Sequence, residues 1–314
     1  MGNANRIQVE WSCGGHSALS ATRNMLAALL LVSTASSFGQ RGADEFSTVV
    51  VRKHLHILEQ VLTGSLNEEA GRCKKAKHAG CRLDELLPYN ASLRAIGRDW
   101  PPFGFTMVGH ARLANVRMVM EAVIRDNIPG SFTEMGVWRG GGCIYAKAII
   151  DLLSPSRPRD VHLFDIFAPM RQYGGTEHTN FLAVREETVR RNFRKFDVLD
   201  ERVHFHKGLF KHSIPGFSRA SKDPIAVLRI DGNFYDSYQD AMYYLYERVP
   251  VGGYIIWDDI LTHKKVKRFW ADFKREQGLP EEMVRIDSDA SYFRKTKDIK
   301  VDWKHFRAPQ DANK

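Results

Sequence analysis

Residues 132–153 read FTEMGVWRGGGCIYAKAIIDLL, and this stretch decides the fold. Residues 132–137 have the apolar, β-branched and aromatic character of a strand, and residues 143–153 are predicted to form a helix rich in Ala and Ile. Four glycines lie within the turn between them. Glycine lets a backbone turn sharply and approach a ligand closely, because it has no Cβ. The stretch therefore predicts a strand, a ligand-binding turn and a helix in direct succession.

The chain on both sides of this stretch alternates between strand-like and helix-like segments. Apolar runs such as AVLRI (226–230) and YIIW (254–257) are typical of strands buried on both faces. This alternation predicts an α/β fold with a doubly wound, mostly parallel sheet. The other predicted strands are 161–167, 203–207 and 225–230, the predicted helices are 46–66, 113–124, 182–196 and 237–248, and a long polar loop is expected at 168–179.

An acidic residue, Glu134, comes just before the first glycine of the turn. The sequence GVWRGGG departs from the GxGxxG spacing that seats a dinucleotide pyrophosphate. A carboxylate in this place would repel a pyrophosphate, but it could accept a hydrogen bond from the ammonium group of a methionine moiety. The turn therefore favours S-adenosylmethionine over NAD. Asp165 ends the next strand (VHLFD), where acidic residues commonly bind ribose hydroxyls.

Three aspartates follow two further strands. Asp231 comes after strand 225–230, and Asp258 and Asp259 come after strand 254–257. The carboxyl ends of parallel strands meet at one edge of a sheet, so we expect these side chains to lie together. A bound cation would keep such a group ionised, and oxygen ligands suit Mg²⁺, Mn²⁺ or Ca²⁺ better than zinc. A helix N-cap role could explain Asp259 alone but not all three.

A divalent cation at this edge could lower the pKa of a substrate hydroxyl and so prepare it to attack a sulfonium methyl group. His263 lies four residues beyond Asp259, which makes it a candidate general base.

Residues 106–143 and 228–259, which contain the blocks MGVWRGG and RIDGNFYDS, resemble the macrocin O-methyltransferase (TylF-like) family. Its members are metal-dependent enzymes that methylate sugar hydroxyls on macrolides and related natural products. The segments VRKHLHILEQVLTGSLNEE and, more loosely, MVRIDSDASYFRKTK are also similar, so the resemblance runs from about residue 46 to residue 297.

This resemblance implies a Rossmann-like class I methyltransferase fold with an N-terminal helical extension, a small-molecule hydroxyl acceptor and a homo-oligomer. It implies that Mg²⁺ (or Mn²⁺) is bound by Asp231, Asp258 and Asp259, and that Asp231 could act as the base in place of His263. The S-adenosylmethionine contacts that it implies are Thr106, Glu134, Gly136, Val137 and Asp165.

The sequence departs from the family pattern in three places, one of which is Trp257, a bulky residue just before the predicted metal pair. The family tends to have Asp-Ser-Phe-Glu-Gly after the second strand, where residues 165–169 read DIFAP, and Asn233 stands where an acid is usual. These departures leave a second hypothesis open, a non-catalytic S-adenosylmethionine-binding protein on the same scaffold. An NAD-dependent oxidoreductase is disfavoured by Glu134 and by the glycine spacing.

The 314 residues carry a formal net charge of +9, with 43% hydrophobic and 26% charged residues. The basic residues are scattered and do not alternate with aromatic residues, so the charge does not predict nucleic-acid binding. An anionic substrate or a membrane surface remains compatible with it.

We divide the chain into a tail (1–45), a helical extension and connector (46–105) and a methyltransferase core (106–314). The apolar run MLAALLLV (25–32) is too short to span a bilayer, which takes roughly 20 residues. The tail is interpreted either as a targeting segment or as a poorly ordered extension, and no compartment is predicted. Cys73 and Cys81 would pair only in an oxidising compartment.

Overall fold

The computed structural model describes residues 40–71, 86–168 and 182–307, and the chain divides into two compact units, residues 1–53 and 54–314. A targeting segment before residue 40, the pairing of Cys73 with Cys81, and nearly all of the predicted loop 168–179 lie outside the described residues. The boundaries at residues 45 and 105 stay predictions. Among the described helices, none is long and apolar enough to cross a membrane.

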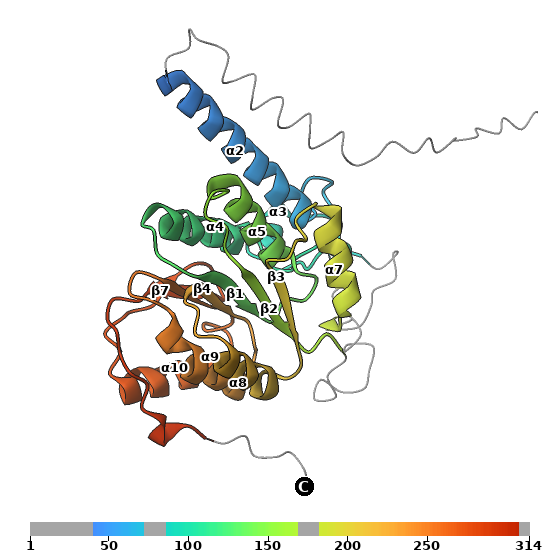
Figure 1. Cartoon of the computed structure of the whole chain (residues 1–314). Coiled ribbons are helices and arrows are strands. Elements are labelled where there is room, and N and C mark those ends of the chain that lie inside the picture. The colour runs from blue at the N-terminus through green and yellow to red at the C-terminus, as the bar shows by residue number, and fades with distance from the viewer. Residues whose placement is uncertain (1–39, 72–85, 169–181, 308–314) are drawn as a thin grey trace, which may run out of the picture. The chain divides into compact units, whose positions relative to one another are not determined.

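Helices and strands alternate along the described part of residues 110–277 (Figure 1). The helices are α2 (Gln40–Leu62), α3 (Ala91–Ala95), α4 (His110–Arg125), α5 (Gly141–Leu153), α7 (Glu186–Lys195), α8 (Phe210–Ala220), α9 (Tyr235–Leu245) and α10 (Lys264–Gln277), with the 3₁₀ helices η3 (Tyr246–Arg248) and η4 (Trp303–His305). The strands are β1 (Ser131–Met135), β2 (Val161–Asp165), β3 (Val203–Lys207), β4 (Ile225–Ile230), β5 (Tyr254–Trp257), β6 (Val284–Arg285) and β7 (Ser291–Arg294).

The strands form a seven-stranded sheet in the order β3-β2-β1-β4-β5-β7-β6. The neighbours from β3 to β5 pair in parallel, while β7 runs antiparallel to both β5 and β6. The predicted doubly wound, mostly parallel α/β fold is therefore confirmed. Since β1 and β4 lie side by side at the centre, the loops that follow them meet at the carboxyl edge of the sheet.

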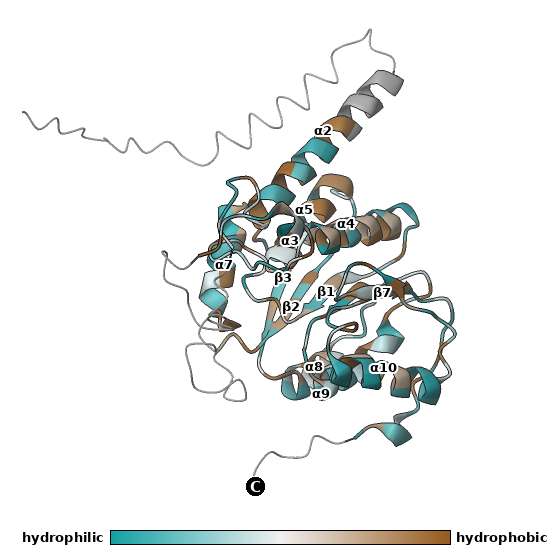
Figure 2. Ribbon diagram, turned by 180° about the vertical axis from the view of Figure 1, so that it is seen from behind, coloured by the Kyte–Doolittle hydropathy of each residue, from teal (hydrophilic) through white to brown (hydrophobic). Residues whose placement is uncertain are grey.

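Helices cover both faces of this sheet. Helices α4, α5 and α7 lie on one face and α8, α9 and α10 on the other, as Figures 1 and 2 show from opposite sides. Side chains alternate between the faces along each strand. Thus Met135, Leu228 and Ile230 join the buried apolar cluster beneath α9 and α10, whereas Glu134 and Arg229 point to the opposite face.

Several elements were not predicted from the sequence, among them the short helix α3, helices α8 and α10 and the hairpin of β6 and β7. Helix α8 contains Pro215, which removes a backbone donor and hides the helical pattern. Helix α10 is strongly polar, and the hairpin of β6 and β7 is short. One predicted helix is also shorter than expected, because α7 begins at Glu186 instead of residue 182, and its first turn carries two acidic residues that favour a helix start there.

A cluster of histidines lies on β2 and β3, on the face covered by α8. Nδ1 of His162 is 3.1 Å from Nε2 of His206, and the His206 ring stacks on Phe164 with centroids 4.1 Å apart. Burial, followed by the charges of the neighbouring histidines, lowers the pKa of His162 to about 3 and that of His206 to about 4. Both rings are therefore neutral in the folded protein near neutral pH.

These two histidines should make the fold acid-sensitive. In the unfolded chain they take up protons near pH 6.5, whereas the folded protein resists protonation until about pH 4, so stability falls as the pH drops between these values. Each histidine should contribute a slope of the order of 1 kcal/mol per pH unit. Urea unfolding from pH 7.5 to 5 should therefore show a shallower loss for His206→Phe than for wild type. His212→Phe, an exposed histidine on α8, should keep the wild-type slope; equal slopes in all three proteins would contradict the prediction.

Candidate active site at the carboxyl edge of the sheet

The glycine turn between β1 and α5 packs directly against the start of the loop after β4. Gly136 has φ +82°, and a Cβ there would lie 2.0 Å from the backbone oxygen of Asp231. Only glycine fits this close approach in this conformation. Thr106 lies at the other end of the turn, because a Cβ on Gly141 would be 2.7 Å from its Cβ. The structure thus brings Thr106, the glycine turn and Asp231 to one place.

Glu134 lies within β1 and is buried. One of its carboxylate oxygens accepts from Arg229 on the paired strand β4, and the other accepts from the thiol of Cys143 on α5, 2.8 Å away. Both oxygens therefore have donors within the chain itself, whereas the sequence predicted an S-adenosylmethionine contact for this residue. A carboxylate oxygen has two lone pairs, so a further donor could still be accepted.

The Asp165 side chain stabilises the glycine turn through hydrogen bonds. Its Oδ2 accepts from the backbone N–H groups of Val137 (2.9 Å) and Trp138 (3.3 Å), and its Oδ1 accepts from Phe167 (3.0 Å). The carboxylate thus couples the end of β2 to the turn after β1. It stands where the sequence predicted a ribose contact, with lone pairs remaining for hydroxyl donors.

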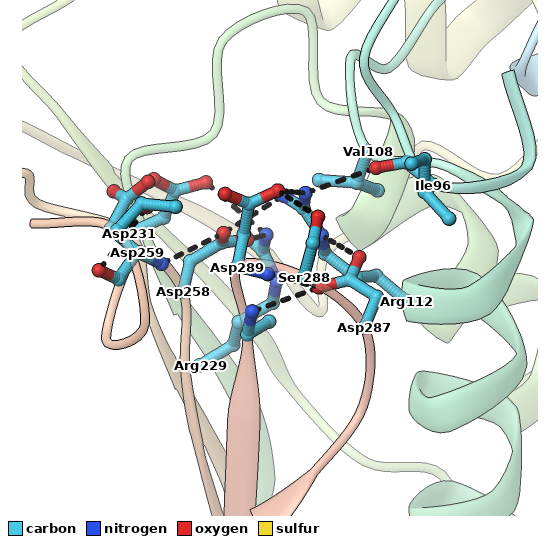
Figure 3. Close-up of polar contacts among 12 residues, drawn as sticks. Ile96, Val108, Arg112, Arg229, Asp231, Asp258, Asp259, Asp287, Ser288 and Asp289 are labelled. Atoms are coloured by element: carbon cyan, nitrogen blue, oxygen red, sulfur yellow. Dashed lines mark hydrogen bonds and ion pairs between the residues drawn. The ribbon is translucent and has the colours of Figure 1, made fainter. Parts of the chain in front are cut away.

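The aspartates that follow β4 and β5 form one cluster. Asp231, Asp258 and Asp259 each offer an oxygen, and these oxygens lie within 4.8 Å of one another (Figure 3). The Asp258 side chain is 1% exposed, whereas those of Asp231 and Asp259 are 27% and 15% exposed. The sequence-based expectation that the strand ends bring these three residues together agrees with the geometry.

Two buried arginines hold the innermost aspartate. Arg229 donates through one nitrogen to Asp258 and to Asp231, the latter at 3.2 Å, and Arg112 on α4 donates to Asp258 at 2.8 Å. Neither arginine was identified from the sequence as a site residue. The sequence did, however, contain a feature from which Arg229 could have been identified. An arginine in the middle of an apolar central strand requires a buried carboxylate partner.

Arg112 also reaches the turn between β6 and β7. It donates to Asp287 at 2.7 Å and to Asp289 at 3.1 Å (Figure 3). Asp289 forms a second ion pair, with Arg98, at 2.7 Å. These residues are far from Arg112 in the chain, so no sequence spacing could predict the contacts. These ion pairs connect the β6–β7 hairpin to the candidate site.

The three clustered carboxyl groups differ in acidity. Burial opposes ionisation of Asp258, but Arg112 and Arg229 outweigh it and hold its pKa below the usual value. Burial and the charge of Asp258 raise the pKa of Asp231 to about 7. Burial and the charges of Asp231 and Asp258 likewise raise the pKa of Asp259. The arginines therefore outweigh the effect of burial at Asp258, whereas at Asp231 and Asp259 burial and the neighbouring negative charges prevail, although Arg229 also pairs with Asp231.

His263 lies at the rim of this cluster. It precedes α10, and its Nδ1 is 3.3 Å from Asp259, with 44% of the side chain exposed. It is close enough to reach a ligand bound over the aspartates, and it is far more exposed than they are.

A hard cation fits this set of residues. Oδ2 of Asp259 is buried and has no hydrogen-bond partner among the described residues, which is costly for a polar atom. Carboxylates also exceed cations in the surrounding network. Its guanidinium groups belong to Arg98, Arg112 and Arg229, and its carboxylates to Glu134, Asp231, Asp258, Asp259, Asp287 and Asp289. Oxygen donors and excess negative charge are what Mg²⁺ or Mn²⁺ would require.

Strained backbone gathers in the loops at this edge. Trp138, Phe167, Asn233 and Asp259 follow β1, β2, β4 and β5 respectively, and all have positive φ, between 47° and 59°. Non-glycine residues adopt this conformation at a cost, and such residues cluster at functional sites. Asn233 tolerates it better than most residue types do.

Comparison with known proteins agrees with this geometry. Residues 51–295 match the family model "Macrocin-O-methyltransferase (TylF)". The chain is 36% identical over 255 residues to a demethyldecarbamoylnovobiocin O-methyltransferase of Streptomyces niveus, covering 78% of this chain and 94% of the relative. It is 32% identical over 259 residues to a mycinamicin III 3''-O-methyltransferase of Micromonospora griseorubida, covering 78% and 97%.

The fold also has a close counterpart among solved structures. The structure of the O-methyltransferase NovP superposes with a TM-score of 0.69 at 35% identity, over 79% of this chain and all of that one. The fold, the glycine turn and the sequence similarity agree, so the chain belongs to the macrocin O-methyltransferase (TylF) family and is an S-adenosylmethionine-dependent O-methyltransferase.

Proposed function

We propose that the acceptor is a hydroxyl group of a sugar or another natural product, and that methyl transfer to it is assisted by Mg²⁺ or Mn²⁺ bound at Asp231, Asp258 and Asp259. The observation that carries the metal proposal is the approach of the three carboxylates to within 4.8 Å, next to the glycine turn. The acceptor class is supported by the relatives, which are named for reactions on novobiocin, tetracenomycin and mycinamicin compounds.

The residues around the glycine turn would bind the methyl donor. We assign this role to Thr106, Gly136 and Val137, with Glu134 and Asp165 as carboxylate acceptors for the donor's ammonium and ribose groups. Asp165 also fixes the turn through its bonds to backbone N–H groups, so the surface that receives the donor is formed before binding.

The aspartate cluster would act on the acceptor. A divalent cation, when bound, supplies a positive charge that lowers the pKa of a nearby hydroxyl. Asp231 and His263 are the two candidate bases for its proton: Asp231 lies inside the cluster, and His263 lies at its rim, 3.3 Å from Asp259. A homo-oligomer is also proposed, by analogy with the family, and light scattering of the purified protein tests it.

Asp259→Asn should weaken metal binding and catalysis without removing the side-chain volume. We expect Mn²⁺ affinity to fall at least about tenfold and kcat/KM at least about 100-fold, because a ligand contributes more than the surrounding residues do. Electron paramagnetic resonance of free Mn²⁺ and product detection with glycosylated hydroxyl compounds measure the two effects. Asp272→Asn, an aspartate that pairs with Arg275 on α10, is the matched control and should behave like wild type.

The same assay separates turnover from binding alone. Calorimetry should show that wild type and Asp259→Asn both bind S-adenosylmethionine. Wild type should form product readily with metal, and Asp259→Asn should form it at least about 100-fold less efficiently. Binding without product across a broad panel of glycosides, macrolides and phenols would instead favour a non-catalytic S-adenosylmethionine-binding protein.

His263→Gln should identify the base. If His263 accepts the hydroxyl proton, kcat falls by roughly 100-fold or more while the KM for S-adenosylmethionine stays constant, because a general base contributes about this much. We expect this result, since the exposed imidazole lies beside the cluster, with its Nδ1 3.3 Å from Asp259. An unchanged kcat would assign the proton to Asp231.

A further inference from the structure

Tyr238 lies on the first turn of α9, and its side chain is completely buried. Its ring packs against Trp257 on β5, with centroids 4.7 Å apart. The hydroxyl group points toward the ends of β4 and β5, where its single proton is shared between two acceptors, the backbone oxygen of Ile230 at 3.0 Å and that of Asp258. One hydroxyl thus spans the two strand ends.

These two carbonyl groups directly precede two of the clustered aspartates. The carbonyl of Ile230 belongs to the peptide bond that leads into Asp231, and the carbonyl of Asp258 to the one that leads into Asp259. The last backbone bond between these strand ends runs from the Asp258 N–H to Ile230, at 2.9 Å. Beyond this bond the sheet no longer holds together the segments that follow β4 and β5, and the Tyr238 hydroxyl lies where these segments begin.

The backbone conformation of Asp259 depends on the hydrogen bond between Tyr238 and the Asp258 carbonyl. Asp259 has φ +59°, and a non-glycine residue keeps such a conformation only where its surroundings enforce it. The orientation of the preceding peptide group sets this angle, and Tyr238 holds the carbonyl of that group. The turn that follows Asp259 fixes the backbone on its C-terminal side, because the His263 N–H donates to the Asp259 carbonyl at 2.8 Å.

We propose that Tyr238 is a positioning residue, whose hydroxyl sets the spacing of the Asp231 and Asp259 carboxylates through the two backbone carbonyls and so determines how tightly the cluster binds a divalent cation. The inference rests on the proposed function of the aspartate cluster. Tyr238 does not touch the cation or the acceptor, and the residue is replaceable without changing any charge of the site.

The chain contains a matched control. Tyr246, in η3 directly after α9, is equally buried, but its hydroxyl has no hydrogen-bond partner among the described residues. Tyr238→Phe and Tyr246→Phe each remove one buried oxygen atom and leave the ring in place. They differ in whether that oxygen holds the strand ends.

The test measures the binding of Mn²⁺ alone, by electron paramagnetic resonance of free Mn²⁺, in wild type and both variants. Tyr238→Phe should raise the Kd at least about tenfold, the range found when residues that orient metal ligands are removed. Tyr246→Phe should stay within about twofold of wild type. In kinetics, Tyr238→Phe should raise the Mn²⁺ concentration needed for half-maximal activity, and kcat at saturating Mn²⁺ should recover most of its wild-type value.

The outcomes separate this inference from the proposed function. If wild type binds no Mn²⁺, the proposed metal role fails, and the inference fails with it. If wild type binds Mn²⁺ and Tyr238→Phe binds it equally well, only the positioning role is overturned. An equal loss in both variants would also overturn it, because removal of any buried hydroxyl would then suffice. Circular dichroism checks folding, and a variant unfolded in buffer is titrated in sucrose, which stabilises the folded state.

Discussion

A single buried guanidinium group, that of Arg229, joins three neighbouring strands at the point where they present their side chains to the site. It pairs with Glu134 from β1, with Asp231 after its own strand β4, and with Asp258 after β5. Taking a charge out of water costs several kcal/mol, and only close opposite charges offset it. The position of each of these carboxylates therefore depends on the same cation, and that cation is fixed by the central strand.

The three clustered aspartates are paired unequally with the arginines, and they differ in acidity for this reason. Arg112 adds a second cation to Asp258, which is thereby kept ionised, while Asp231 and Asp259 remain in an environment that opposes their charge. Glycine at position 136 allows the turn after β1, the proposed methyl-donor site, to pack onto the Asp231 backbone. The glycine turn and the aspartate cluster are consequently in direct contact, and a displacement of one would be transmitted to the other.

The sequence could predict what depends on local pattern. Strands 203–207, 225–230 and 254–257 were predicted with the bounds that the structure has, and the last two are mainly apolar runs buried along their whole length, which leave few alternatives to a strand. The aspartates could be placed at one edge because parallel strands end together. Helix α8 was missed because Pro215 interrupts its pattern, and the β6–β7 hairpin because its strands are too short to show a period.

What the sequence could not supply is the set of partners that hold the site. Arg112 meets Asp258 across 146 positions and Asp289 across 177, and Tyr238 acts through carbonyl groups, which every residue has. Such contacts arise only when the fold brings distant segments together. Their common effect is to keep like charges and a left-handed backbone at one edge of the sheet, although both are individually unfavourable.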